Sequence, residues 1–244
     1  MSYAVLDSPI PIGPWRSVFS PPSVFARECF IDEVAEQTKQ DPLKLRLRLL
    51  GSDDPSVAPM LEVADEKIDR RKMRRVLETV AAKANWGINP AKGRAWGLAC
   101  NVFHTETYIA YIVEVSLRKK APAGELPFQV HRVVCAVDCG LAINPLGVAQ
   151  QVESGVIWGL SNMKSEITAK NGAIEQRYYS DFPVVNIRET PASIETHIVS
   201  SEDERPHGLG EPTVCPLAPA VANALSRLVG KRIRRLPVLA ADLA

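Results

Sequence analysis

The 244-residue sequence has almost no excess of charge of either sign, since 29 lysines and arginines face 28 aspartates and glutamates. A function based on bulk electrostatic attraction to nucleic acid or to an anionic membrane is therefore excluded. No apolar run reaches the roughly 18 residues that a membrane-spanning helix needs. The N-terminus has neither a basic segment nor an apolar stretch of the secretory kind. We therefore expect no signal peptide and a cytoplasmic location, or a periplasmic one if the chain is exported with a partner.

Cysteine is also scarce, and the five cysteines are scattered: Cys29, Cys100, Cys135, Cys139 and Cys215. An odd number without a spacing pattern favours a reducing compartment over a disulfide framework. Cys135 and Cys139 belong to a stretch that predicts a strand, where residues four apart are separated by about 13 Å at roughly 3.3 Å per residue. That distance is too long for one shared zinc ion, so we predict buried thiols there.

The patterns that are present predict helices first, then a mixture of strands and helices, which indicates an α+β fold with mixed sheets and packed helices. Helical spacing of apolar residues, with Ser23 as an N-cap and Asp41-Pro42 and Gly51 as start and stop signals, predicts several helices. They cover residues 24–34, 43–50, 66–83, 146–163 and 216–229. β-Branched and aromatic stretches predict strands. These cover residues 94–102, 107–117, 128–137, 164–170, 173–178 and 191–200, and a basic-apolar strand closes the chain.

Two regions follow from this order. Residues 1–88 are predicted to hold an extended, proline-rich N-terminal segment and a helical region, with a linker at 51–55. Residues 89–244 are predicted to form an α+β region. Trp15 and Arg16 lie in the proline-rich segment, and two interpretations of them stay open. They belong to a ligand-contacting loop, or Trp15 is an ordinary core residue that anchors the segment.

The most informative short motif is Gly210-Glu211-Pro212, directly ahead of a helix rich in small residues. Gly210 has no Cβ, so a large group can approach the backbone beside the carboxylate. Pro212 fixes its own φ and biases Glu211 toward an extended conformation. A rigid carboxylate beside open space suits a positioned general base. The motif alone is equally consistent with a loop glutamate before a helix that begins with proline.

Gly155 and Gly159 lie one turn apart inside a predicted helix. Each costs about 1 kcal/mol relative to alanine, so they indicate that something approaches the helix closely. That group is either another backbone of the protein or a ligand. The sequence favours neither.

The order of motifs is more specific than any single one. Trp15-Arg16-Ser17 comes first, Gln151 follows Asn144-Pro145, and Gly210-Glu211-Pro212 precedes a helix of small residues. From about residue 12 to residue 237, the chain resembles the molybdopterin-binding large subunit of the xanthine dehydrogenase/aldehyde oxidase family. The isoquinoline 1-oxidoreductase β-subunit is the most similar branch. The resemblance implies the fold of the C-terminal part of that subunit's molybdopterin-binding domain.

The resemblance also implies a mechanism. In this family a pterin holds the molybdenum, and the glutamate of a Gly-Glu-Pro motif takes a proton from a metal-bound hydroxyl. Glu211 matches that catalytic base. Gln151, Arg16 and Gly210 match positions beside the pterin and the metal. The neighbours of Arg16 differ from the family's glycine-rich loop, and His207 is larger than the residue usual at its position.

Parts of the family pattern are missing. The glycine-rich segments that bind the dinucleotide of the cofactor have no equivalent, and no cysteine cluster fits an iron–sulfur centre. The resemblance therefore implies the C-terminal half of a large subunit, inactive when isolated. It implies molybdenum-molybdopterin, in the cytosine dinucleotide form, shared with a chain that carries the N-terminal half. [2Fe–2S] clusters are expected on a separate small subunit, and the substrate is expected to be an N-heterocycle or an aldehyde.

Two alternatives remain. The chain is a non-catalytic assembly module or remnant that docks on a cofactor-binding partner chain. Or it is an unrelated hydrolase that uses Glu211 with His207 or Asp181, which is disfavoured because the sequence has no nucleophile elbow and no zinc motif.

Overall fold

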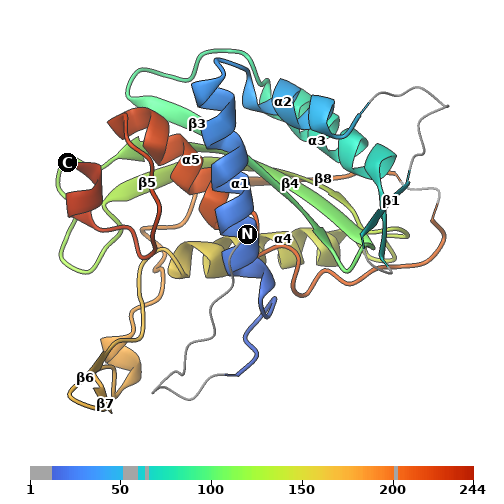
Figure 1. The fold of residues 1–244 in the computed structure, drawn as a ribbon. Coiled ribbons are helices and arrows are strands. Elements are labelled where there is room, and N and C mark those ends of the chain that lie inside the picture. Colours follow the sequence, from blue (N-terminus) through green and yellow to red (C-terminus); the bar gives the residue numbers. More distant parts are fainter. Residues whose placement is uncertain (1–12, 52–59, 64–65, 201–202) are drawn as a thin grey trace.

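The structure is a computed structural model that describes residues 13–51, 60–63, 66–200 and 203–244, and it places helices on both faces of a four-stranded sheet (Figure 1). The predicted α+β class is confirmed. The helices are α1 (Ser20–Gln37), α2 (Pro42–Leu49), α3 (Arg70–Ala84), α4 (Pro145–Ser161) and α5 (Leu217–Val229). The sheet consists of β3 (Arg94–Phe103), β4 (Thr107–Leu117), β5 (Phe128–Asp138) and β8 (Ser193–Ile198). Two small hairpins are β1 (Met60–Val63) with β2 (Glu66–Asp69) and β6 (Ala169–Lys170) with β7 (Ala173–Ile174).

The sheet has the order β3-β4-β5-β8, antiparallel except for the parallel pair β5 and β8. Strand β4 is buried on both faces because successive side chains point to opposite sides. Ile109, Tyr111 and Val113 enter the core that contains α4 and α5. Ala110 and Ile112 enter the core that contains α3. Burial on both sides explains why the sequence of this strand is continuously apolar rather than alternating.

Helix α5 lies very close to the sheet at Gly97 of β3. A Cβ at Gly97 would overlap the carbonyl oxygen of Ala220 and lie 2.7 Å from the amide nitrogen of Ala224. The small residues of α5 and the glycine of β3 therefore let two backbones touch. The small residues of this helix thus serve its packing on the chain's own sheet.

The two glycines of α4 accommodate the segment that leads into α5. A Cβ at Gly155 would lie 2.6 Å from the carbonyl carbon of Thr213, and one at Gly159 would lie 2.8 Å from Cδ2 of Leu217. The group that approaches this helix is thus a segment of the same chain, through both side-chain and backbone atoms, and not a ligand.

Helix α1 differs from the prediction at its start and on its buried face. It begins at Ser20, with prolines in its first turn, and the Ser23 hydroxyl donates to the Phe19 carbonyl instead of capping the helix. Proline is well suited to the first turn of a helix because its missing N–H would have no partner there. The apolar spacing also misled the prediction, because Phe30 is 64% exposed whereas Glu28 and Asp32 are buried.

Ion pairs explain how acidic residues are buried in α1. Glu28 accepts from Arg46 of α2 at 3.1 Å, and both side chains are almost fully buried. Asp32 accepts from Arg227 at 2.6 Å and from Arg232 at 2.8 Å. The N-terminal helix is thereby tied to α2 on one side and to the C-terminal segment on the other.

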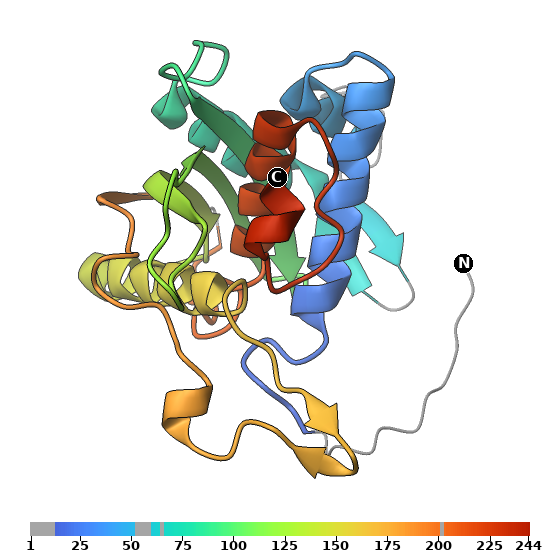
Figure 2. The ribbon, with the colours of Figure 1, turned by 90° about the vertical axis from the view of Figure 1, so that its left-hand side faces the viewer.

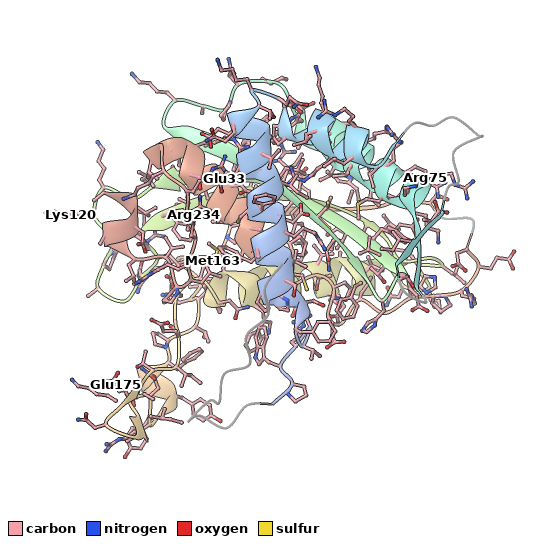
Figure 3. The ribbon with its side chains drawn as sticks, viewed as in Figure 1. Glu33, Arg75, Lys120, Met163, Glu175 and Arg234 are labelled. Carbon is pink, nitrogen blue, oxygen red and sulfur yellow. The ribbon has the colours of Figure 1, made fainter. Side chains whose placement is uncertain are left out.

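The start of another predicted helix is wrong, and so is the predicted C-terminal strand. Residues 66–69 form β2 and not the first turn of a helix, and α3 begins at Arg70 with Asp69 as its N-cap. Residues 231–239 form no strand; they lead to a short 3₁₀ helix, Ala240–Leu243. Arg232 and Arg234 of this segment pair with α1. Figure 3 labels Arg234 and Glu33, and Arg234 Nη2 donates to Glu33 Oε1 at 2.6 Å. The remaining predicted helices and long strands match within about three residues.

Residues 164–189 form an arm that projects from the body of the molecule (Figures 1 and 2). Its tip is a tight turn between the two strands predicted at 164–170 and 173–178, and Asn171 and Gly172 have positive φ angles of 51° and 77° there. The flanking strands are only two residues long each, much shorter than predicted. The base of the arm is fixed by the buried pair of Lys164 and Glu189, whose side chains meet at 2.6 Å.

The division at residue 88 stays a prediction. Val76, Leu77 and Val80 of α3 share one core with Ile112 and Val134 of the sheet. Residues 1–12 and positions 52–55 of the predicted linker lie outside the described residues.

We expect Gly97→Ala to lower the free energy of unfolding by about 3 kcal/mol, because the added methyl group overlaps the backbone of α5. Urea denaturation of the isolated chain measures this. Gly13→Ala is the control, because a Cβ there meets no atom within 4 Å. Equal stability of the two variants would contradict the close packing at Gly97.

Candidate active site

The proline-rich N-terminal segment meets the Gly-Glu-Pro motif directly, although they are 194 residues apart in sequence. Arg16 Nε donates to the carbonyl oxygen of Gly210. Ser17 donates twice to Glu211, from its amide to the carboxylate oxygen Oε1 at 3.0 Å and from its hydroxyl to the backbone carbonyl at 2.6 Å. The tertiary structure therefore brings the two separate motifs into one site.

Helix α4 supplies the second side of the site. Arg16 Nη1 donates to the hydroxyl of Ser154 at 2.9 Å, and Nη2 donates to Gln151 Oε1 at 3.3 Å. Gln151 and Ser154 are three residues apart, so they lie on one face of the helix. Arg16 thus links α4 to Gly210, and all four residues expected from the sequence, Arg16, Gln151, Gly210 and Glu211, lie within one hydrogen-bonded group.

Buried groups on either side hold Glu211 in place. The Tyr111 hydroxyl donates to the carbonyl of Thr213 at 2.8 Å, and the Thr107 hydroxyl donates to the carbonyl of Gly208 at 2.9 Å. Burial raises the pKa of Tyr111 well above its ordinary value, so this hydroxyl stays protonated as a donor. Glu211 is half-buried between two segments anchored to β4.

Ser17 is a residue of the site that the sequence prediction missed. It is 1% exposed and has a left-handed backbone with φ of 76°, and Val18 follows at 50°. Such a conformation costs a residue with a side chain about 1–2 kcal/mol. Its place beside Arg16 in a turn was the available signal, but nothing local shows that a partner lies 194 residues away.

Trp15 is not a core residue, since 42% of it is exposed. Its ring contacts that of Trp158 of α4 edge to face, with centroids 5.9 Å apart, and Trp158 is 44% exposed. The two indoles form a half-exposed aromatic edge beside Arg16 and Gln151. Of the two interpretations of Trp15, the structure rules out the core anchor.

The residues of the hydrolase alternative are engaged elsewhere. The His207 ring lies 2.8 Å from Asp203 Oδ2 and is itself almost fully buried. This hydrogen bond is the main cause that lowers the pKa of the Asp203 carboxyl. Asp181 accepts from the backbone amides of Arg177 and Tyr178 in the arm. Neither His207 nor Asp181 hydrogen-bonds to Glu211 in the described part of the chain.

The predicted burial of Cys135 and Cys139 is confirmed. Cys135, Cys139 and Cys215 are buried, and all five thiols are free. Among the described residues, no group of three or more histidine, cysteine, aspartate or glutamate side chains could hold a metal ion. In the same residues, no helix is both long enough and apolar enough to cross a membrane.

Comparison with known proteins identifies the family. The family model of the molybdopterin cofactor-binding domain matches residues 35–191. The chain belongs to this molybdopterin-binding family. It is thus a relative of the xanthine dehydrogenase/aldehyde oxidase proteins that the motif order suggested.

Three curated relatives agree with the assignment. The membrane-bound aldehyde dehydrogenase of Gluconacetobacter polyoxogenes, whose name specifies pyrroloquinoline quinone, is 31% identical over 88% of the chain. The β-subunit of isoquinoline 1-oxidoreductase from Brevundimonas diminuta is 28% identical over 88%, and a nicotinate dehydrogenase subunit from Pseudomonas putida is 28% identical over 92%. The chain spans 27%, 25% and 18% of the length of these three proteins, respectively.

Solved structures share the fold at low sequence identity. Quinoline 2-oxidoreductase from Pseudomonas putida 86 superposes with a TM-score of 0.72 at 11% identity, over 90% of this chain and 50% of that one. Aldehyde oxidoreductase from Desulfovibrio gigas gives 0.65 at 14% identity, over 94% of this chain and 41% of that one. The fold of this chain is therefore that of part of a molybdenum hydroxylase.

The site suits a metal that is held by another ligand. A Cβ at Gly210 would meet no atom within 4 Å, so space is open beside the carboxylate of Glu211. Gln151 binds Arg16 through its oxygen, which directs its amide group to other acceptors. The chain thus presents an acceptor and a neutral donor, without the cluster that would ligate the metal itself in its described residues.

We expect the five thiols to react very slowly in the native chain. Burial raises the pKa of Cys29 and Cys100 to about 12, and it also raises the pKa of the other three. A thiol with a pKa of 12 has about a thousandfold less thiolate near pH 8 than one with the ordinary value of 9. Titration with an aromatic disulfide at pH 8 should give no rapid reaction, and five equivalents should react in urea. A native thiol that reacts within seconds would contradict the described burial.

Proposed function

We propose that this chain is the C-terminal half of the large subunit of a molybdenum hydroxylase, and that it supplies the catalytic base. The observation that carries the proposal is the group of Arg16, Gln151, Gly210 and Glu211, which converges from three distant parts of the sequence. Membership of the molybdopterin-binding family provides the chemical context. The reaction is hydroxylation of an N-heterocycle or oxidation of an aldehyde, with water as the source of oxygen.

Each residue then has a distinct task. When bound, the molybdenum–pterin group supplies the redox centre and acidifies a coordinated water. Glu211 accepts the proton on its carboxylate. Because the water is acidified, this transfer requires only that the carboxylate is correctly placed. Gln151 donates from its amide group, since its oxygen is occupied by Arg16 at 3.3 Å. Arg16 holds Gln151 and Gly210 in register, and Gly210 leaves room beside the carboxylate.

The finer assignments rest on the family. We propose the cytosine dinucleotide form of the cofactor, shared with a chain that carries the N-terminal half, and [2Fe–2S] clusters on a small subunit. The names of three relatives refer to nicotinate, isoquinoline and an aldehyde, which supports an N-heterocycle or aldehyde substrate. One relative is named for pyrroloquinoline quinone. Molybdenum analysis distinguishes that cofactor from molybdopterin.

The exposed side chains of the arm support the proposal that this chain binds a partner chain. Ile167, Tyr178, Tyr179 and Ile187 expose between 54% and 101% of their surface, and they lie on a projection that leaves the body (Figure 2). Aromatic and aliphatic side chains of this kind are typical of protein interfaces. We propose that the arm contacts the chain that carries the cofactor-binding half. The alternative of a non-catalytic assembly module shares this contact and lacks the chemistry.

The central test is Glu211→Gln in the complex purified after co-expression with the neighbouring genes. We expect molybdenum content to stay unchanged and kcat to fall about 10³-fold, because the amide cannot accept the proton. Glu153→Gln on the exposed side of α4 is the control and should retain full activity. Full turnover in Glu211→Gln would exclude its role as base. A wild-type complex without molybdenum would favour the assembly module.

The partner contact is tested by Tyr179→Glu, which places a charge at the fully exposed position of the arm. We expect the affinity for the cofactor-binding chain to fall at least tenfold, with the thermal stability of the isolated chain unchanged. Isothermal titration calorimetry measures the affinity. Leu49→Glu on α2, which is 63% exposed, is the matched control and should bind normally. Equal affinities of Tyr179→Glu and Leu49→Glu would show that the arm is not part of the interface.

A further inference from the structure

A strained turn lies next to the candidate base. The amide of Val18 donates to the carbonyl of Trp15 at 2.6 Å and closes a four-residue turn, in which Ser17 is the third residue with φ of 76°. Glycine or asparagine is normal at such a position, because a positive φ crowds any larger side chain. This chain places a serine there and buries it to 1% exposure. A contact of the Ser17 side chain thus compensates for the strained backbone.

The contact is with Glu211. Ser17 Oγ donates to the backbone carbonyl of Glu211 at 2.6 Å, and Ser17 N donates to carboxylate Oε1 at 3.0 Å. One residue therefore binds both ends of the glutamate. In the described part of the chain, the Ser17 amide is the only hydrogen-bond donor to this carboxylate. The torsions between the backbone and the carboxylate are restricted, and no described residue donates a hydrogen bond to the second oxygen.

We propose that Ser17 is a positioning residue that holds the Glu211 carboxylate in place for proton transfer, with its hydroxyl on the backbone and its amide on the carboxylate. This inference rests on the proposed role of Glu211 as base. Ser17 itself touches no reacting atom. This positioning role also explains the serine at a position where the backbone favours glycine. Glycine would retain the amide contact and lose the hydroxyl contact.

Ser17→Gly separates positioning from folding. Glycine relaxes the left-handed turn, so the melting temperature should not fall. The glutamate loses one of its two anchors, so kcat of the assembled enzyme should fall about tenfold or more, with KM within twofold and unchanged molybdenum content. Small misplacements of a reacting group have effects of this size. Ser23→Ala, which removes a hydroxyl bonded to the Phe19 carbonyl in the same segment, should retain wild-type kcat.

The outcomes are distinguishable. Wild-type kcat in Ser17→Gly, with Glu211→Gln inactive, overturns the positioning role and leaves the base intact. Turnover in Glu211→Gln would contradict the proposed function itself.

A second measurement needs no cofactor. Amide hydrogen exchange of Ser17, followed by NMR in the full chain, should be at least tenfold faster in Glu211→Ala than in the wild type, because the carboxylate acceptor at 3.0 Å is gone. Glu153→Ala should leave the rate unchanged, and amides of β4 report whether the core stays folded. An unchanged Ser17 rate in Glu211→Ala would overturn the contact on which the inference depends.

Discussion

The packing of residues 213–217 against two glycines of α4 is the contact on which the candidate site depends. Any side chain at Gly155 would collide with Thr213, and any at Gly159 would collide with Leu217. The segment is also bonded to β4 through the Tyr111 hydroxyl. Glu211 lies two residues before Thr213, so its position follows from this packing. The same segment directs α5 onto the glycine of β3, which joins the site to the core.

A second set of contacts brings the N-terminal segment to the site. Helix α1 is held by buried acids, Glu28 with Arg46 and Asp32 with Arg227 and Arg232. Buried ion pairs are weak sources of net stability, since desolvation offsets much of their attraction, but they depend strongly on geometry. A helix held by apolar contacts alone could shift along its axis by one turn, whereas these ion pairs form in only one register of α1. That register fixes the turn at residues 15–18 beside Gly210 and Glu211.

The candidate site gathers polar groups from three distant parts of this chain. The chain contributes a carboxylate held by Ser17 and an amide held by Arg16, and its described residues contain no group of three or more side chains that could hold a metal ion. Its curated relatives are several times longer, and its arm exposes aromatic side chains away from the body. Contacts within this chain hold Glu211, and such preorganisation is what its proposed role as base requires.

The sequence by itself determined the elements that depend on near neighbours. The buried strands, the Asp41 cap of α2, the Asn171-Gly172 turn and the Gly230 end of α5 all follow from local patterns. Motif order also supplied Arg16, Gln151, Gly210 and Glu211, although their roles stay predictions. Local patterns failed where distant charges decide burial, as in α1 and the C-terminal segment. Only the tertiary structure decided what the glycines of α4 contact, that Trp15 meets Trp158, and that Ser17 binds Glu211. The physical reason is that these contacts join residues far apart in the chain, and no local periodicity encodes such a partner.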